Sequence, residues 1–257
     1  MARIDPIAKH YQAPDILDIM ANILFYLLAT VAIAIALIKQ KDLKEFASIA
    51  FVAMVVIYFI LKHLAALFLM PNAERLRRKQ LLSDSFSVPL LHESTKEYYN
   101  NSISPSCQRL GSNIFESTFF SHRILAKMLV SERIKLATFF TIWIIALAYR
   151  GLSQEIVIII SQTLFSAEII ARWISMELLK TRVCEAYNDM YRYFLTKPSN
   201  ISESTALILE SFSHYESAKA AATIRLSSKI FNELNSELSA EWQRIKLELK
   251  IDESTIP

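Results

Sequence analysis

Long runs of apolar residues recur along the chain, and two of them lie close together in its first part. The first run covers residues 19–38 without a charge, and about 20 apolar residues are what an α-helix needs to cross the hydrocarbon core of a bilayer. The second runs from Phe46 to Met70 and is interrupted by Lys62 and His63. Because only the segment KQKDLKE separates the two runs, we expect two membrane helices that form a hairpin.

A second pair of apolar runs lies further along, from Leu136 to Tyr149 and from Ile156 to Ala171, with the short turn RGLSQE between them. Each run is shorter than a standard span, so a buried hairpin of a soluble domain is the alternative interpretation. Trp143, Tyr149 and Trp173 lie at or toward the ends of these runs, where amphipathic rings favour the membrane interface. This position favours a second transmembrane hairpin.

Basic residues are concentrated at one end of the predicted spans. The positive-inside rule therefore places the N-terminus, the segment between the hairpins and the C-terminal segment in the cytoplasm. Lys39, Lys41 and Lys44, in the first hairpin turn, argue weakly for the opposite orientation. The basic residues on the predicted cytoplasmic side are Arg75, Arg77, Arg78, Lys79, Arg133, Lys135, Arg172, Lys180 and Arg182.

The rest of the chain also favours helices, since two glycines in 257 residues leave little scope for hairpin turns between strands. We predict an all-α membrane protein with four transmembrane helices as two hairpins. The middle segment and the C-terminal helices are expected to build a cytosolic helical domain. The predicted segments are a cytoplasmic N-terminal segment 1–18, a first transmembrane hairpin 19–70, a cytoplasmic middle segment 71–133, a second transmembrane hairpin 134–172 and a cytoplasmic C-terminal helical region 173–257.

One face of a long C-terminal helix is apolar, with spacings of three and four residues that are typical of an amphipathic helix. The sequence KPSN, residues 197–200, is expected to separate it and its neighbours from the helix that continues from the fourth run. The face packs either on its own domain or between subunits. Its residues are Leu226, Ile230, Leu234, Leu238, Trp242, Ile245 and Leu249.

Several kinds of chemistry lack their motifs in this sequence. Two glycines cannot supply a GxGxxG fingerprint or a phosphate-binding P-loop. Cys107 and Cys184 have no His or Cys at a metal-ligand spacing, and neither GxSxG nor HExxH occurs. A net charge of +3 does not suggest DNA binding. We therefore expect no catalytic residues, no metal and no cofactor, and no positive argument favours an enzyme.

The middle segment has residue types that suit recognition of a nucleotide. Arginine offers a planar fork of donors to phosphate, tyrosine can stack on a base, and asparagine can hydrogen-bond a base edge. The alternative is a structural loop in which the tyrosines anchor the chain and the asparagines close turns. The candidate residues on these grounds are Arg75, Arg77, Arg78, Arg109, Tyr98, Tyr99, Asn100 and Asn101.

Three polar residues interrupt the apolar runs, namely Lys62, His63 and Glu168. Charge inside a membrane is costly unless it is paired or hydrated, so these residues are candidates for facing a pore or for gating. The alternative is that they extend to the membrane surface.

The order of the parts resembles a known family. Two apolar helices lead to RLRRKQLLSDSFSVPL, TKEYYNN and NIFESTFFSHRI, then to two further apolar helices and a tail with LSSKIFNELNSELSAEW. This order resembles the SMODS-associating four-transmembrane effector family of bacterial cyclic-oligonucleotide-based antiphage signalling systems. The resemblance covers most of the chain.

The resemblance implies a multi-pass protein of the bacterial inner membrane that binds a cyclic di- or oligonucleotide made by a partner nucleotidyltransferase. Such an effector disrupts the membrane and causes abortive infection. A four-helix unit is too small to enclose a wide pore alone, so we expect a homo-oligomer. The alternatives are a structural scaffold or ungated channel without nucleotide binding, and a membrane-bound enzyme. The resemblance adds weight to a ligand role for Asp84, Ser85, Phe86, Tyr98, Tyr99, Asn100 and Asn101.

Overall fold

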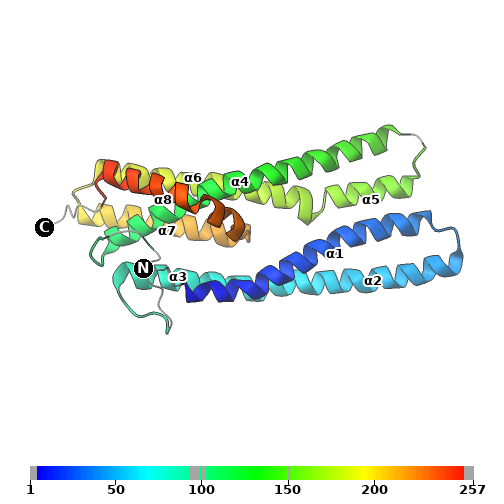
Figure 1. Ribbon diagram of the computed structural model, residues 1–257, viewed down its shortest axis with the longest axis horizontal. Coiled ribbons are helices and arrows are strands. Elements are labelled where there is room, and N and C mark those ends of the chain that lie inside the picture. Colours follow the sequence, from blue (N-terminus) through cyan, green and yellow to red (C-terminus); the bar gives the residue numbers. More distant parts are fainter. Residues whose placement is uncertain (1–4, 93–98, 100–101, 150, 252–257) are drawn as a thin grey trace. The chain divides into compact units, whose positions relative to one another are not determined.

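The fold is built from helices in every part of the chain that the computed structural model describes, which is residues 5–92, 99, 102–149 and 151–251. This confirms the predicted all-α class, and Figure 1 shows the elements in chain order. The elements are η1 Pro6–Tyr11, α1 Gln12–Leu37, α2 Lys41–His63, η2 Leu64–Leu69, α3 Met70–Phe86, α4 Cys107–Ala148, α5 Gln154–Leu164, η3 Ala167–Ala171, α6 Arg172–Thr196, α7 Ile201–Ala222 and α8 Ser228–Leu249.

Contacts between residues divide the chain into two compact units. One consists of Lys9–Pro71 and Val130–Ile174 and is called the hairpin unit below. The other consists of Met1–Ala8, Asn72–Leu129 and Ser175–Pro257 and is called the core unit. The divisions fall within helical stretches of the chain, since α4 and α6 each contribute residues to both units.

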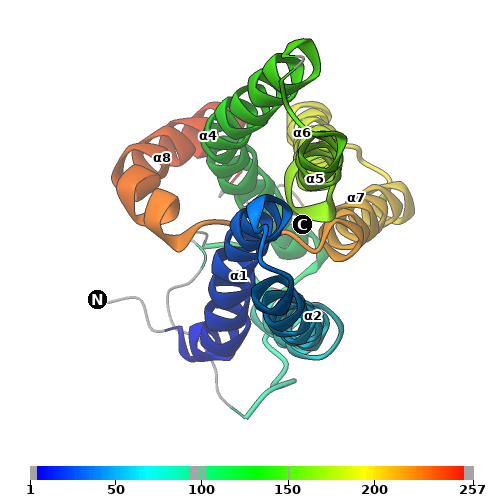
Figure 2. The same ribbon diagram turned by 90° about the vertical axis from the view of Figure 1, so that its right-hand side faces the viewer.

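In the hairpin unit, α1 and α2 lie side by side and are joined by residues 38–40, as Figures 1 and 2 show. Helix α1 also contacts α5. The last part of α4 is tied to α5 by a hydrogen bond of 2.9 Å from the Trp143 indole to the Ser161 hydroxyl. The Tyr26 ring of α1 stacks with that of Phe139 on α4. These contacts bring the four predicted apolar runs together in one bundle.

Large apolar side chains point outward over much of this bundle. None of the residues of α2 is buried, and Phe46 and Ile49 are each 71% exposed. Of the described helices, three are long and apolar enough to cross a membrane: Pro6–Leu37, Lys41–Phe86 and Gln154–Thr196. An exposed apolar surface of this extent is unfavourable in water but suits contact with lipid. The structure therefore indicates a multi-pass membrane protein.

The third predicted run forms the last part of α4 and is not one of those three helices. Its apolar part is short because Glu132, Arg133 and Lys135 directly precede Leu136. The fourth predicted run consists of α5, a break at Phe165 and Ser166, and η3.

Two π-helical segments interrupt the long helices of the hairpin unit. The first, η2, lies between α2 and α3 without a break in the helix, so that Lys41–Phe86 is helical throughout. The second, η3, begins after Ser166, whose hydroxyl accepts a hydrogen bond from the backbone N–H of Glu168. A π-helix is rare and often marks a functional position in a helix.

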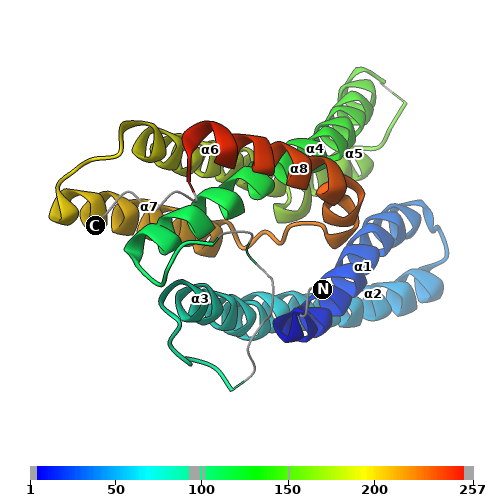
Figure 3. The same cartoon turned by 60° about the vertical axis from the view of Figure 1, so that its left-hand side comes forward.

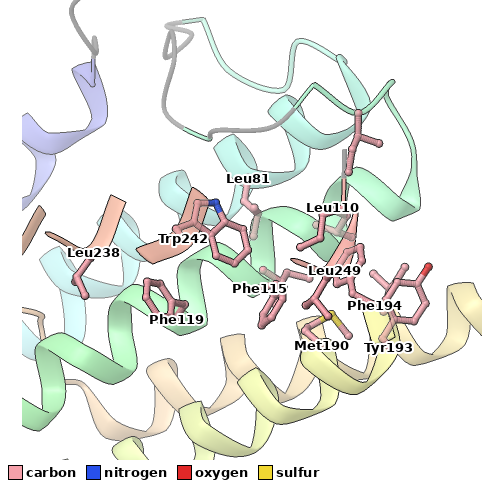
Figure 4. Packing of buried hydrophobic residues seen from close by; sticks show 14 residues of the cluster. Leu81, Leu110, Phe115, Phe119, Met190, Tyr193, Phe194, Leu238, Trp242 and Leu249 are labelled. Carbon is pink, nitrogen blue, oxygen red and sulfur yellow. The ribbon is translucent and has the colours of Figure 1, made fainter. Parts of the chain in front are cut away.

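The core unit is organised around a cluster of buried aromatic and aliphatic side chains from α3, α4, α6, α7 and α8. Figure 3 shows α4 and α8 running alongside α6 and α7. The rings of Phe115 and Phe194 are stacked, and Trp242 meets Phe115 edge-on, as Figure 4 shows. Gly111 permits this close packing, because a Cβ atom there would lie 3.1 Å from the Ile208 side chain of α7. The cluster comprises Leu81, Ile103, Leu110, Ile114, Phe115, Phe119, Met190, Tyr193, Phe194, Ile208, Leu238, Trp242, Leu249 and Ile251.

The apolar face of the C-terminal helix packs on its own unit, which was the first of the two expected arrangements. Leu238, Trp242 and Leu249 are buried in the cluster, while Leu234 and Ile245 pack against it. The expected break at residues 197–200 is confirmed, because α6 ends at Thr196 and α7 begins at Ile201. The Asn200 side chain accepts hydrogen bonds from the N–H groups of Ser202 and Glu203 and so caps α7.

Two leucines on α8 provide a matched test of this packing. Leu249 is 5% exposed and Leu247 is 78% exposed. Leu249→Ala is expected to lower the free energy of unfolding by about 2–5 kcal/mol, because it leaves a cavity in the core. Leu247→Ala is expected to change it by less than about 0.5 kcal/mol. Unfolding of the full chain in detergent, followed by circular dichroism, measures both. Equal effects would contradict the described packing of α8.

Candidate functional site

The most deeply buried charge in the hairpin unit is the carboxylate of Glu168, whose residue is 3% exposed. The hydroxyl of Ser166 caps the turn that carries it. Glu168 Oε1 lies 2.8 Å from Lys62 Nζ and accepts a hydrogen bond of 2.8 Å from the Tyr58 hydroxyl. A buried carboxylate without such partners would be strongly unfavourable, so its two partners on α2 compensate for its loss of water.

Lys62 and Glu168 belong to a longer chain of ion pairs. Lys62 Nζ is also 3.0 Å from Asp18 Oδ1 on α1, and Arg172 Nη1 on α6 is 4.0 Å from Asp18 Oδ2. Arg172 Nε lies 3.4 Å from Glu132 Oε1 on α4, and Lys135 Nζ lies 2.5 Å from Glu132 Oε2. The ion pairs therefore connect residues that lie within or directly beside all four predicted apolar runs.

We call these six residues the charge layer, because they lie at the same end of the four apolar runs. Asp18 directly precedes the first run, Lys62 follows the uncharged part of the second, and Lys135 directly precedes the third. Each of these three residues lies at the end of its apolar run that is farther from the hairpin turn. Three acidic and three basic side chains balance one another, which limits the electrostatic cost of partial burial. The layer consists of Asp18, Lys62, Glu132, Lys135, Glu168 and Arg172.

The structure brings together two of the three residues that were predicted to face a pore or to gate it. Lys62 and Glu168 are direct partners. His63 lies apart from them, since its ring packs on Phe59 and its Nδ1 is 2.9 Å from the Phe59 carbonyl oxygen.

Five members of the arrangement were not expected as site residues: Asp18, Tyr58, Glu132, Lys135 and Arg172. The available signal was the position of charged residues of both signs at the same end of each run. The sequence prediction used only the basic residues there, to orient the chain. Tyr58 carried no signal of its own, because a tyrosine in an apolar run is equally consistent with an interfacial ring.

The four arginines predicted to bind phosphate all have partners within the protein. Arg77 forms two hydrogen bonds with the Asp5 carboxylate, of 3.1 and 2.9 Å. Arg75 donates to the side-chain oxygen of Asn72 over 2.9 Å. The remaining pairs are Arg78 with Glu216 at 3.1 Å and Arg109 with Asp84 at 3.2 Å.

Asp84 and Ser85 connect the end of α3 to the beginning of α4. The Asp84 carboxylate accepts hydrogen bonds from Arg109 and from Asn113, the latter over 3.0 Å. The Asn113 amide also lies 3.0 Å from the hydroxyl of Ser85, which is fully buried and donates to the Leu81 carbonyl. These bonds give Asp84 and Ser85 a structural role in the core unit.

The other predicted ligand residues lie in or near the segment between α3 and α4. Phe86 is 39% exposed at the end of α3, and Tyr99 packs against the buried cluster of the core unit. Tyr98, Asn100 and Asn101 lie outside the described residues.

A second group of charges lies inside the core unit and includes Arg78. The Glu216 carboxylate pairs with Arg78 and with Lys219, whose Nζ is 2.7 Å away, and Lys219 is also 3.6 Å from Glu74. Burial lowers the pKa of Lys219, but the neighbouring Tyr215, Glu216 and Glu74 outweigh this effect and raise it. Burial raises the pKa of the Tyr215 hydroxyl, which bonds to Ser121. Both groups therefore keep their protons at neutral pH.

No protein-family model, curated protein or solved structure matches this chain.

The pair of Lys62 and Glu168 gives a direct prediction. Lys62→Met leaves the Glu168 carboxylate buried without its cation, and is expected to lower the free energy of unfolding by about 3–5 kcal/mol. The double variant Lys62→Met with Glu168→Gln removes both charges and is expected to recover most of this loss. Unfolding in detergent, followed by circular dichroism, measures both.

The matched control is Lys41→Met on the same helix. Lys41 is 87% exposed and its pair with Glu45 is 4.0 Å long, so its removal is expected to change the free energy of unfolding by less than about 1 kcal/mol. A Lys62→Met protein as stable as Lys41→Met would contradict the energetic role of the charge layer.

Proposed function

We propose that this protein is a bacterial antiphage effector that crosses the inner membrane four times and permeabilises it, as a homo-oligomer, on binding a cyclic nucleotide messenger. The observation that carries the proposal is the charge layer. It joins four apolar segments at one level around the buried carboxylate of Glu168. Charged residues that pair with one another within membrane segments often mark functional positions.

Four spans are supported by the shared level of these ion pairs. If α1 and α2 cross the bilayer, Asp18 and Lys62 lie near one membrane surface. The pairs of Arg172 with Asp18 and with Glu132 then place the neighbouring ends of the third and fourth apolar runs at the same depth as these residues. Residues 136–148 of α4 extend about 20 Å at 1.5 Å per residue, so this span requires a locally thinned bilayer. In this arrangement the two hairpin turns face the periplasm, and the N-terminus, the middle segment and the C-terminal region face the cytoplasm.

The messenger is inferred from the resemblance to the SMODS-associating four-transmembrane effectors, together with the arginine–carboxylate pairs. The phosphates of a cyclic nucleotide would compete with Asp5, Asp84 and Glu216 for the guanidinium groups that these carboxylates hold. If a phosphate replaced Asp84 as the partner of Arg109, the contact between α3 and α4 would change. The ligand opens the membrane only to the extent that it binds the permeabilising state more tightly than the resting state.

Assembly of several copies is required because side chains fill the interior of a four-helix bundle. The outward apolar side chains of α2 leave this helix available to lipid or to another copy. A pore or a wider lesion would then form between subunits, with abortive infection as its consequence.

A second candidate is a membrane scaffold or ungated channel without nucleotide binding. The specific observation in its favour is that Arg75, Arg77, Arg78 and Arg109 all have partners within the protein. In that case the arginine pairs serve only to hold the core unit together.

Dye release from liposomes tests the gated function. Purified protein in vesicles of phosphatidylethanolamine and phosphatidylglycerol is expected to retain a trapped dye until a cyclic di- or trinucleotide is added. The added nucleotide is expected to be recovered unchanged, because the protein binds it without turnover. Binding is followed separately by calorimetry. Retention of the dye with every messenger that binds would support the scaffold instead.

Labelling of single cysteines tests the four-span topology. In a Cys107→Ser, Cys184→Ser background, Lys39→Cys and Ser153→Cys are expected to react with a membrane-impermeant maleimide added outside spheroplasts. Ser199→Cys, in the break between α6 and α7, is expected to react only after the membrane is permeabilised. Protection of Ser153→Cys together with labelling of Lys39→Cys would show that the second hairpin does not cross.

A further inference from the structure

We propose that the two π-helical segments beside the charge layer are the moving parts of its switch, and that a change to α-helical register separates Lys62 from Glu168. This inference rests on the proposed membrane-permeabilising function and specifies how the resting state is held and released.

The π-helical segments lie on both sides of one ion pair. Glu168 is part of η3 itself, and Lys62 precedes the first residue of η2, Leu64, by two positions. The Tyr58 hydroxyl, one turn earlier on α2, bonds to the same carboxylate oxygen as Lys62. The two irregular segments therefore adjoin the contact at which α2 meets the buried carboxylate.

The sequence of η2 does not itself favour a π-helix. Its residues are LAALFL, and alanine and leucine are among the best α-helix formers. No proline or glycine interrupts it. Pro71, two residues after η2, has no backbone N–H to donate to Leu67 and therefore favours an irregular helix at this position. The exact register of the irregularity also depends on what its surroundings hold in place. The fixed position of Lys62 between Asp18 and Glu168 supplies that constraint.

One backbone hydrogen bond at the end of η3 is long. The backbone N–H of Ala171 reaches the carbonyl oxygen of Ser166, five residues back, over 3.5 Å. A distance of 3.5 Å is long for such a bond, so η3 gains little from it. The capping of Glu168 by Ser166 and the pairing of its carboxylate instead fix this segment.

A change of register in either segment would break the ion pair. One residue in an α-helix corresponds to a rotation of about 100° and a rise of about 1.5 Å. If η2 became α-helical, its extra residue would no longer be accommodated. The part of α2 that carries Lys62 and Tyr58 would then rotate relative to the helix that follows η2. Glu168 cannot stay buried and charged without them, so the register of the helix and the ion pair change together.

Deleting Ala66 tests the inference. The deletion removes the residue that the π-helix accommodates and is expected to bring α2 and α3 into one α-helical register. In the liposome assay without any nucleotide, the deletion variant is expected to release dye about tenfold faster than the wild type, or more. A control carries the same deletion and one alanine inserted between Leu69 and Met70, which restores the residue count, and it is expected to retain the dye.

Lys62→Gln provides the second variant. It breaks the ion pair without altering the register, and is also expected to release dye without nucleotide. Because the register and the pair form one switch, Lys62→Gln combined with the deletion is expected to release dye no faster than the faster single variant. Circular dichroism in detergent establishes that each variant is folded. If the deletion variant does not fold, Lys62→Gln alone decides, and retention of the dye by Lys62→Gln overturns the switch.

The outcomes distinguish this inference from the proposed function. A folded deletion variant that leaks only with messenger, as the wild type does, overturns the switch and leaves messenger gating intact. A deletion variant that leaks while the wild type responds to no messenger supports the switch and argues against messenger gating. Release of dye by the length-restored control at the rate of the deletion variant also overturns it, since the residue count would then be irrelevant.

Discussion

The buried carboxylate of Glu168 is the constraint around which the hairpin unit is arranged. At 3% exposure it requires partners, and it finds them in Lys62 and Tyr58 of α2. Lys62 in turn carries the contact to Asp18 on α1, and Arg172 extends it to Glu132 on α4. Apolar contacts between helices in lipid specify position weakly, because lipid is as apolar as the side chains. The ion pairs supply the missing specificity.

The two units are stabilised in different ways. The core unit has an aromatic cluster around Phe115 and Trp242, and burial of this surface is the ordinary driving force of a water-soluble fold. The hairpin unit turns large apolar side chains outward and buries the paired carboxylate of Glu168, which is the arrangement expected where lipid replaces water. Helices α4 and α6 contribute residues to both units, so the chain passes from one unit to the other within helices.

Much of the fold could be predicted from the sequence, because the period and length of the apolar runs depend on local chain geometry. The all-α class, the break at residues 197–200 and the buried face of α8 followed from such patterns. The partners of Lys62 could not be predicted, because Asp18 and Glu168 are distant in sequence and meet only once the hairpins pack. The π-helical segments were not predicted, although Pro71, two residues after η2, is a sequence signal for an irregular helix there. The proposed ligand role of Tyr98, Asn100 and Asn101 stays a prediction.

The central claim is that the ion pair between Lys62 and Glu168 holds the membrane bundle in its resting state. Exchanging the two charges tests it most directly, through dye release from liposomes without nucleotide. We predict that Lys62→Glu and Glu168→Lys each release the dye, while a protein that carries both substitutions together with Asp18→Asn, which removes the second carboxylate beside position 62, releases it more slowly than either single variant. Retention by both single variants, or release by the triple variant as fast as by the single variants, would contradict it.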